Sequence, residues 1–328
     1  MKGLVYKMTS KQVAILMSTY NGEKYLEQQI KSIIQQSYSD WVLYIRDDGS
    51  EDHTADIIKK YSQIDDRVIF FNEGHVENIG VTRSFMELFS QVNADFYMFS
   101  DQDDYWKRDK VLHTLNAMLE QDFRKEPVCV HTDLQIVNAE LQGSEVMNGG
   151  YIWHDFPHLL FCNCVTGCTM MVNQKLKDLM HFEKINYDKI YLHDWWIALV
   201  ASAFGKVVYI NEATIMYRQH EGNVIGSNEK NTVSHLLYRV THQIPERQHM
   251  RRVIRISHEL DAIYGKKLPN LAYNYVHNYG DLAYKGTPLH NIKLSIKFPP
   301  QRMTPKGKFF FTYLMVVYNQ DLRKIAEE

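Results

Sequence analysis

The residues best suited to chemistry are three carboxylates, Asp101, Asp103 and Asp104, which stand within four positions after the apolar run 94–99. Such a run predicts a buried strand of a parallel sheet, and open α/β sheets bind ligands at the carboxyl ends of their strands. Carboxylates this close repel one another unless a cation lies between them. Mg²⁺ and Mn²⁺ bind carboxylate oxygens and keep coordination positions for phosphate. The stretch therefore indicates either a metal-diphosphate site or a solvated acidic loop.

The elements that would position these carboxylates follow a regular alternation. Strands are predicted at 13–17, 41–45, 67–71 and 94–99, and amphipathic helices with apolar residues on one face separate them. This order predicts an α/β fold with a mainly parallel, doubly wound sheet and right-handed crossovers. Further strands are expected at 128–131, 134–137, 165–172, 207–210 and 214–217.

The second strand ends in Asp47-Asp48-Gly49-Ser50, where Asp47 and Asp48 are placed to accept hydrogen bonds from a base N–H or from ribose hydroxyls. The alternative is an ordinary Asp-Gly turn. Neither G-x-G-x-x-G nor G-x-x-x-x-G-K-[ST] follows any of these strands, which argues against a dinucleotide-binding dehydrogenase and a P-loop ATPase.

Two later residues add candidate chemistry. Asp194 opens an apolar helix, where its carboxylate caps the helix in one interpretation and removes a proton from a substrate in the other. The two roles are compatible. His220 follows a predicted strand and is a surface residue, a core residue or a nitrogen ligand for the metal.

Charge is distributed unevenly along the 328 residues. Residues 231–328 contain 15 Lys and Arg against 7 Asp and Glu, which leaves 22 against 32 for residues 1–230. The chain is thus an acidic body with a basic C-terminal region, and a one-sided basic region favours an anionic partner. We expect either docking on a membrane surface or a helical subdomain that completes an acceptor site or a dimer interface. No recognised nucleic-acid-reading module is present.

The apolar tracts and cysteines constrain the cellular setting. The longest strongly apolar tract, 309–318, is about half the length of a spanning helix, and no signal segment is recognised near the start. Four cysteines lack the paired spacing of a zinc site, so buried thiols are expected. We expect a cytoplasmic protein that is soluble or peripheral on the cytoplasmic face of the inner membrane.

Four motifs in one order resemble the family 2 inverting glycosyltransferases of GT-A fold, and their wording is most similar to the bacterial rhamnosyltransferase branch. The motifs are Ser18-Thr19-Tyr20-Asn21-Gly22, Asp47-Asp48-Gly49-Ser50, Ser100-Asp101-Gln102-Asp103-Asp104-Tyr105-Trp106, and His193-Asp194-Trp195-Trp196 followed by Tyr217-Arg218-Gln219-His220. The resemblance covers residues 12–225. It implies a GT-A domain at 1–225 and a basic, mainly helical region at 226–328.

Carried onto this sequence, the resemblance implies a role for each motif residue. Those that hold the nucleotide sugar are expected to be Ser18, Tyr20, Glu23, Asp47, Asp48, Arg83, Asp101 and Asp104. Asp101 and Asp103 match the family's D-x-D, and with His220 they would bind Mg²⁺ or Mn²⁺. Asp194 matches the catalytic base, although many relatives have Glu-Asp where this chain has His193-Asp194.

The function expected from the resemblance is transfer of a sugar with inversion, with L-rhamnose from dTDP-L-rhamnose as the favoured donor. The acceptor is expected to be a glycan or a polyprenyl-linked saccharide on the route to a cell-wall or capsular polysaccharide. A glucosyl-, galactosyl- or N-acetylhexosaminyltransferase is the alternative within enzymes. A catalytically silent scaffold subunit is the alternative outside them, and a homo-oligomer is compatible with each.

Overall fold

The computed structural model describes residues 12–149, 152–219, 244–301 and 304–325.

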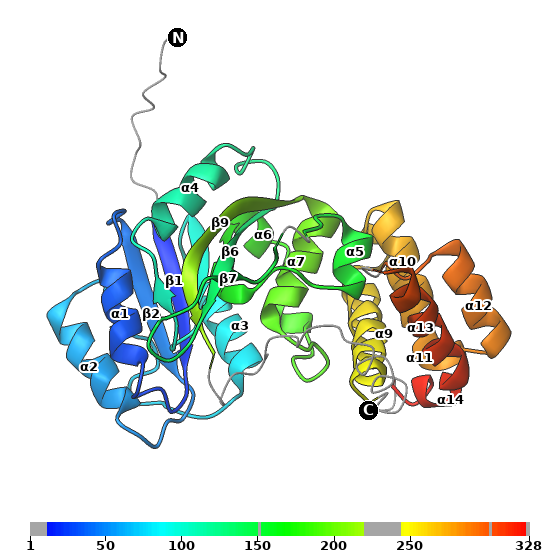
Figure 1. Cartoon of the computed structure of the whole chain (residues 1–328), viewed down its shortest axis with the longest axis horizontal. Helices are drawn as coiled ribbons and strands as arrows, with labels where there is room; N and C mark the ends of the chain where they lie inside the picture. Colours follow the sequence, from blue (N-terminus) through cyan, green and yellow to red (C-terminus); the bar gives the residue numbers. More distant parts are fainter. Residues whose placement is uncertain (1–11, 150–151, 220–243, 302–303, 326–328) are drawn as a thin grey trace, which may run out of the picture. The chain divides into compact units, whose positions relative to one another are not determined.

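Four parallel strands form one half of the sheet. The strands are β1 (Val13–Thr19), β2 (Trp41–Asp47), β3 (Val68–Phe70) and β4 (Phe96–Ser100); they lie in the order β3-β2-β1-β4, and each pair runs parallel. Figure 1 labels β1 and β2 of this half. All four occur where the sequence predicted them. β1 is buried along its whole length, which explains its uninterrupted apolar sequence.

The other half of the sheet contains antiparallel pairs. β8 (Met170–Asn173) pairs with β4, and the order continues through β6 (Val128–Val137), β9 (Lys206–Arg218) and β5 (Tyr105–Trp106), while β7 (Glu145–Val146) pairs with β6. The antiparallel pairs are β4 with β8, β8 with β6, β6 with β7, and β9 with β5. The mixed sheet with helices confirms the predicted α/β, GT-A-like fold. Most of the segment 165–172 is not a strand, since η1 (Gly167–Thr169) precedes β8.

The division of residues 128–137 and 207–217 into two strands each was wrong, because β6 and β9 are continuous. The polar residues that suggested breaks have partners within the sheet. Thr132 Oγ1 lies 2.7 Å from Thr214 Oγ1, and the Tyr209 hydroxyl donates to Asp133 Oδ2 at 2.9 Å. A buried polar side chain with a hydrogen-bond partner does not interrupt a strand.

Helices cover both faces of the parallel strands. Helices α1 (Leu26–Ile34), α2 (Thr54–Ile64) and α4 (Lys110–Leu119) contribute to one core cluster with alternate residues of β1, β2 and β4. On the opposite face, α3 (Val81–Gln91) places Phe85 and Phe89 edge-on against Phe99, with ring centroids 6.0 and 5.4 Å apart. The short α6 (Gln174–Lys177) follows β8.

The chain forms two compact units, one containing residues 1–150, 165–180 and 207–219, the other 151–164, 181–206 and 220–328. The second unit confirms a helical C-terminal region and also includes two segments from the middle of the chain. Its described helices are α5 (Phe156–Phe161), η2 (Phe182–Lys184), α7 (His193–Phe204), α9 (Ile244–Tyr264), η3 (Gly265–Lys267), α10 (Asn270–Gly280), α11 (Leu282–Lys285), α12 (Pro288–Lys297), α13 (Pro305–Val317) and α14 (Asn319–Leu322). Among the described residues, no helix has the length and apolar character needed to cross a bilayer.

Candidate functional site

The loops after β1 and β4 are joined by one side chain. Gln102 accepts a hydrogen bond from the Tyr20 backbone N–H at 2.8 Å and donates from Nε2 to the Tyr20 carbonyl oxygen at 2.9 Å. We call this pair of hydrogen bonds the Gln102 clamp. The Gln102 clamp needs glycine at position 22, because a Cβ there would lie 2.3 Å from Gln102 Oε1 and displace the Gln102 side chain.

The loop after β2 joins the same group. Ser50 Oγ accepts from the Asn21 N–H at 2.9 Å, and Asn21 Oδ1 accepts from the Glu51 N–H at 2.9 Å. Three loops at the carboxyl ends of neighbouring parallel strands are thus connected into one rim. This is the edge at which an open α/β sheet binds its ligand.

The two carboxylates after β2 are both buried and both hydrogen-bonded. Asp47 accepts from Thr19 Oγ1 at 2.8 Å and from Ser50 Oγ at 2.6 Å. Asp48 accepts from Arg46 Nη1 at 2.7 Å and from the N–H groups of Ile79 and Gly80 at 2.9 Å each. Asp48 therefore holds the segment that leads into α3, where the left-handed φ of Gly80 turns the chain.

The other predicted donor-site residues of this unit differ in exposure. Tyr20, Glu23 and Arg83 are exposed, and Arg83 stands in the first turn of α3. Glu23 accepts from the His53 N–H at 3.0 Å, just before α2. Ser18 is buried and donates to Ser84 Oγ at 2.7 Å. The exposed residues can reach a ligand directly, whereas Ser18 connects β1 to α3.

The carboxylates after β4 divide into two kinds. Asp101 and Asp103 are partly exposed, whereas Asp104 is fully buried and accepts from the Arg218 N–H at 3.3 Å. Burial, together with the charges of Asp101 and Asp103, raises the pKa of Asp104 well above its usual range. Beneath the loop, burial lowers the pKa of Lys110 to about 8.

The donor atoms of this loop suit a hard cation. Ligand atoms of Asp101, Asp104 and Cys168 lie within 4.8 Å of one another, but burial raises the pKa of the Cys168 thiol and so favours its protonated form. A protonated thiol is a poor ligand, and Mg²⁺ and Mn²⁺ prefer oxygen. The partly exposed carboxylates Asp101 and Asp103 therefore fit a divalent metal better than the buried pair. His220 lies outside the described residues.

Asp194 belongs to the helical unit, where it stands in the first turn of α7. It is nearly buried, and Asn163 Nδ2 donates to its Oδ1 at 3.3 Å. A carboxylate at a helix N-terminus is stabilised in its charged form by the helix dipole. The neighbouring His193 is buried, and burial lowers its pKa to about 3, so the imidazole is neutral.

The start of α7 is held by neighbouring helices of the same unit. Trp195 donates from Nε1 to the Leu159 carbonyl oxygen at 2.8 Å, and its ring stacks on His249 of α9 with centroids 6.0 Å apart. His249 Nε2 lies 2.9 Å from the carbonyl oxygen of Phe161. The basic C-terminal region is therefore packed against the helix that carries Asp194.

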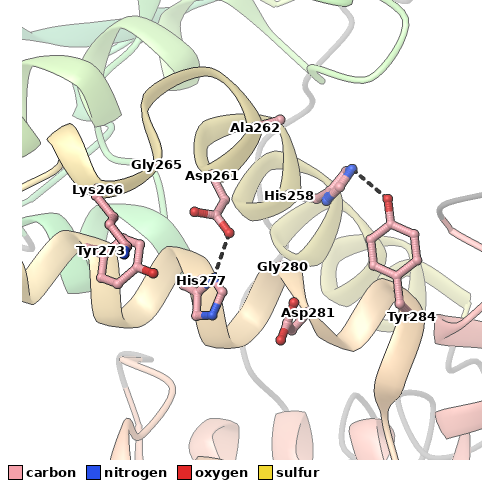
Figure 2. Close-up of a pocket in the computed structure, with 10 residues that line it drawn as sticks. All are labelled: His258, Asp261, Ala262, Gly265, Lys266, Tyr273, His277, Gly280, Asp281 and Tyr284. Carbon is pink, nitrogen blue, oxygen red and sulfur yellow. Dashed lines mark hydrogen bonds and ion pairs between the residues drawn. The ribbon is translucent and has the colours of Figure 1, made fainter.

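A pocket of about 280 Å³ also lies in the helical unit, among α9, η3, α10 and α11 (Figure 2). Two polar pairs line it: His277 Nδ1 lies 2.8 Å from Asp261 Oδ2, and the Tyr284 hydroxyl lies 3.0 Å from His258 Nε2. None of the predicted site residues lines this pocket. It is therefore separate from the chemistry expected of the acidic loop.

Two structurally important residues were missed from the sequence. Gln102 stands between Asp101 and Asp103 and forms the clamp. Arg218 is fully buried, its guanidinium lies 4.2 Å from the centroid of the Tyr25 ring, and its Nη2 donates to Gln28 Oε1 at 2.6 Å. Both residues lie inside the quoted motifs, and this position was the only indication of their importance that the sequence offered. Their partners could not be predicted because they are distant in sequence.

Known glycosyltransferases are similar to this chain in sequence and in fold. Residues 14–125, which include the three connected loops, match the family model "Glycosyl transferase family 2". This part of the chain is thus similar to the family 2 glycosyltransferases. Among solved structures, residues 1–349 of TarS from S. aureus in complex with UDP are similar, with a TM-score of 0.56, 12% identity and coverage of 96% of this chain and 90% of that chain. At this identity the likeness shows the GT-A-like fold alone.

Three curated glycosyltransferases are similar to this chain in sequence. The chain is 29% identical over 222 residues to the dTDP-rhamnosyl transferase RfbG of Shigella flexneri, a match that covers 65% of this chain and 74% of that protein. It is 23% identical over 189 residues to the UDP-Glc:alpha-D-GlcNAc-diphosphoundecaprenol beta-1,3-glucosyltransferase WfgD of Escherichia coli, covering 57% and 69%. The putative teichuronic acid biosynthesis glycosyltransferase TuaG of Bacillus subtilis is 33% identical over 110 residues, covering 33% and 42%.

Proposed function

We propose that the protein is an inverting glycosyltransferase that moves L-rhamnose from dTDP-L-rhamnose onto a hydroxyl of a lipid-linked polysaccharide precursor. The observation that carries this proposal is the rim of three connected loops, which gathers exposed and acidic side chains at the carboxyl ends of β1, β2 and β4. The relative named as a dTDP-rhamnosyl transferase supports the donor. The relative named for a diphosphoundecaprenol substrate supports a lipid-linked acceptor.

Within the proposal, the residues of the rim hold the nucleotide. The exposed Tyr20 and Arg83 offer a ring face and a cation to the base and the diphosphate. Asp47 is buried and already accepts from Thr19 and Ser50, so it shapes the loop that faces the nucleotide. Ser18 and Glu23 act through the loops that they fasten. Asp48 and Asp104 are positioning residues in this scheme, because their buried carboxylates already accept from protein donors.

A divalent cation, Mg²⁺ or Mn²⁺, would be held by Asp101 and Asp103. When bound, it would neutralise charge on the nucleoside diphosphate that departs. His220 is the proposed third ligand, and Arg218, two residues before it in the chain, is bonded to Asp104 beneath the loop. The side chain of Arg218 also places positive charge near Asp103 and Asp104.

Asp194 is the proposed general base. The acceptor hydroxyl loses its proton to the Asp194 carboxylate while its oxygen forms a bond to the anomeric carbon, and the bond between that carbon and the diphosphate oxygen breaks on the opposite face. The electron pair of the broken bond leaves with the nucleoside diphosphate, and the sugar is inverted. Asn163 orients the carboxylate through its amide.

A donor screen tests the proposal. The purified chain is heated with dTDP-rhamnose, UDP-glucose, UDP-galactose or UDP-N-acetylglucosamine, each with Mn²⁺, with Mg²⁺ and with chelator. We expect dTDP-rhamnose with metal to raise the melting temperature most, since a ligand at a hundredfold over its dissociation constant adds about 2.7 kcal/mol of stability. Asp103→Ala should lose this metal-dependent shift.

Asp122→Ala is the control, because Asp122 is an exposed acid in the same unit but pairs with Lys125. It should respond like the wild type. Stabilisation by UDP-glucose alone would favour the alternative of a glucosyltransferase, which the Escherichia coli relative supports. If no nucleotide sugar stabilises the chain, the transferase proposal is contradicted in favour of a scaffold.

A further inference from the structure

Helix α12 has the reverse of the usual distribution of polar and apolar residues. It buries Asn291 and Ser295, whereas Leu289, Ile292 and Ile296 are 63%, 41% and 77% exposed. Residues three and four apart share one face of a helix, so these three form a stripe, which we call the α12 stripe. A helix of a globular protein ordinarily turns its Leu and Ile residues inward.

The rotation of α12 is fixed by hydrogen bonds. Asn291 donates from Nδ2 to the Met315 carbonyl oxygen of α13 at 2.7 Å, and the Ser295 hydroxyl donates to the Asn291 carbonyl oxygen at 2.9 Å. Leu294 is buried on the same side. Turning the stripe inward would separate the buried amide from its partner, which costs about 1–3 kcal/mol. The hydrogen bonds of Asn291 and Ser295 therefore keep the α12 stripe exposed.

Helix α13 carries a second stripe. Phe309, Tyr313 and Val317 are spaced four apart and are 75%, 40% and 50% exposed, while Phe311, Leu314 and Met315 are buried. Both helices begin with a threonine cap and a proline: Thr287 accepts from the His290 N–H at 3.2 Å and Thr304 from the Gly307 N–H at 3.0 Å. The helices are thus defined without help from a partner.

The charge around the stripes has a single sign. The sequence contains no Asp or Glu between Asp281 and Asp321, and in this interval its cations are Lys285, Lys293, Lys297, Arg302, Lys306 and Lys308. Lys293 and Lys297 are exposed and directly follow Ile292 and Ile296 of the α12 stripe. The occupant of this surface must therefore accept aliphatic side chains and carry negative charge at its edge.

A bilayer surface with anionic headgroups meets both requirements. Apolar side chains enter the boundary between headgroups and acyl chains, and the flanking lysines contact the anionic headgroups. A nucleic acid would pair with the lysines but would leave the aliphatic side chains without a partner, since bases stack on aromatic rings. Because no described helix is suited to cross a membrane, the contact would be peripheral.

We propose that the α12 stripe, with Lys293 and Lys297, docks on the surface of an anionic lipid bilayer, and that the α13 stripe adds a second contact. The docking itself does not depend on the proposed sugar transfer. Its benefit rests on that function, because docking would hold the enzyme in the plane of a lipid-linked acceptor. The helix that carries Asp194 belongs to the same unit.

Vesicle flotation tests the proposal with the full chain and no sugar substrate, so its outcome is independent of catalysis. The wild type should float with vesicles of phosphatidylcholine and phosphatidylglycerol at low salt and stay in solution with phosphatidylcholine alone. The variant Leu289→Ser/Ile292→Ser/Ile296→Ser should lose flotation. Lys293→Glu/Lys297→Glu should bind at least roughly 30-fold more weakly, since each lysine near an anionic surface contributes about 1 kcal/mol.

The matched control is Ile64→Ser/Val146→Ser, which removes exposed apolar residues from the other unit and should float like the wild type. Circular dichroism and melting temperature should be unchanged in all variants, because every substituted side chain is exposed. The proposal is overturned if the wild type stays in solution with anionic vesicles at low salt, or if the α12 variant floats normally. It is also overturned if the wild type forms a dimer that the α12 variant loses and neither floats.

Discussion

Asp194 has to accept a proton while it lies in a nearly buried position at the start of an apolar helix. Its carboxylate lies in the first turn of α7 and accepts a hydrogen bond from the amide of Asn163 at 3.3 Å. The capping role expected of Asp194 was wrong, because the N-cap of α7 is Leu192 and no side chain caps this helix. Asparagine has nearly the same size as aspartate but cannot take up a proton, so one substitution separates the packing of residue 194 from its proposed chemistry.

We predict that Asp194→Asn preserves the melting temperature and the affinity for the nucleotide sugar but lowers kcat by roughly 10²–10⁴, the usual contribution of a general base. Steady-state kinetics and donor titration measure the two effects. Asn163→Ala, which removes only the orienting amide, should give a smaller loss of kcat. Near-normal turnover in Asp194→Asn would remove this residue from the mechanism.

His193 predicts a pH dependence of stability rather than of catalysis. Burial lowers the pKa of His193 from 6.5 to about 3. Between these two pH values the unfolded chain binds a proton at this residue, whereas the folded protein does not. Stability is lost progressively from pH 6.5 down to about pH 3, and no effect is present above pH 6.5.

We predict that His193→Gln reduces the fall in the free energy of unfolding between pH 7.5 and pH 4.5 by about 2–3 kcal/mol. Urea unfolding at the two pH values measures it. The comparison uses the difference between pH values, so a loss of packing common to both cancels. An identical pH dependence in the variant and the wild type would contradict a neutral, buried His193.

For individual residues, the sequence identified the acidic side chains but not the difference in their burial and contacts. Asp101, Asp103 and Asp104 look equivalent in the sequence, yet only Asp104 is fully buried. The difference arises from the pairing of β5 with β9, which brings Arg218 beside Asp104. A contact across 114 positions leaves no periodic signal.

Among the elements, the loops after β1 and β4 depend on the Gln102 clamp. We predict that Gln102→Ala weakens binding of the nucleotide sugar about 5- to 10-fold and lowers stability by about 1 kcal/mol, because two partly exposed hydrogen bonds are lost. Gln102→Glu should be intermediate, since its carboxylate can accept from the Tyr20 N–H but cannot donate to the Tyr20 carbonyl. Calorimetric titration with the donor measures these affinities.

Gly22→Ala provides an independent approach to the same clamp, because its Cβ would displace Gln102 Oε1 while the backbone of residue 22 needs no left-handed conformation. It should weaken donor binding like Gln102→Ala. The double variant should bind no more weakly than either single variant, as expected for two changes that remove one interaction. Additive losses, or wild-type affinity in Gly22→Ala, would show that the clamp does not shape the donor site.

The parallel strands could be predicted because their apolar runs are long and are buried on both faces. β6 and β9 were divided wrongly because the polar pairs Thr132-Asp133 and Asn211-Glu212 look like breaks in the sequence. In the sheet, Thr132 contacts Thr214 and Asp133 accepts from Tyr209. The buried face of helix α12 could not be predicted for the same reason. Asn291 is buried because it donates to the Met315 carbonyl, which the sequence does not place beside it. Local patterns thus predict an element best when both of its faces share one environment.

Across the whole molecule, the order of the motifs predicted the fold class and the similarity of residues 14–125 to family 2 glycosyltransferases. The charge asymmetry predicted that the C-terminal region differs from the rest. The sequence could not predict that residues 151–164 and 181–206 join the C-terminal helices in one compact unit. That grouping depends on long-range contacts such as the stacking of Trp195 on His249. The candidate base Asp194 and the candidate metal ligands Asp101 and Asp103 consequently belong to different units.

One feature of the acidic loop offers a practical benefit. Trp106 lies two residues after Asp104, is almost fully buried in β5, and has the Lys110 ammonium 4.8 Å from its ring centroid. Because indole emission responds to nearby charge, this ring is an intrinsic fluorophore three residues after the candidate metal ligand Asp103. Replacing the other four tryptophans would leave a single natural reporter, by which the arrival of an ion or a nucleotide could be followed in real time without a dye.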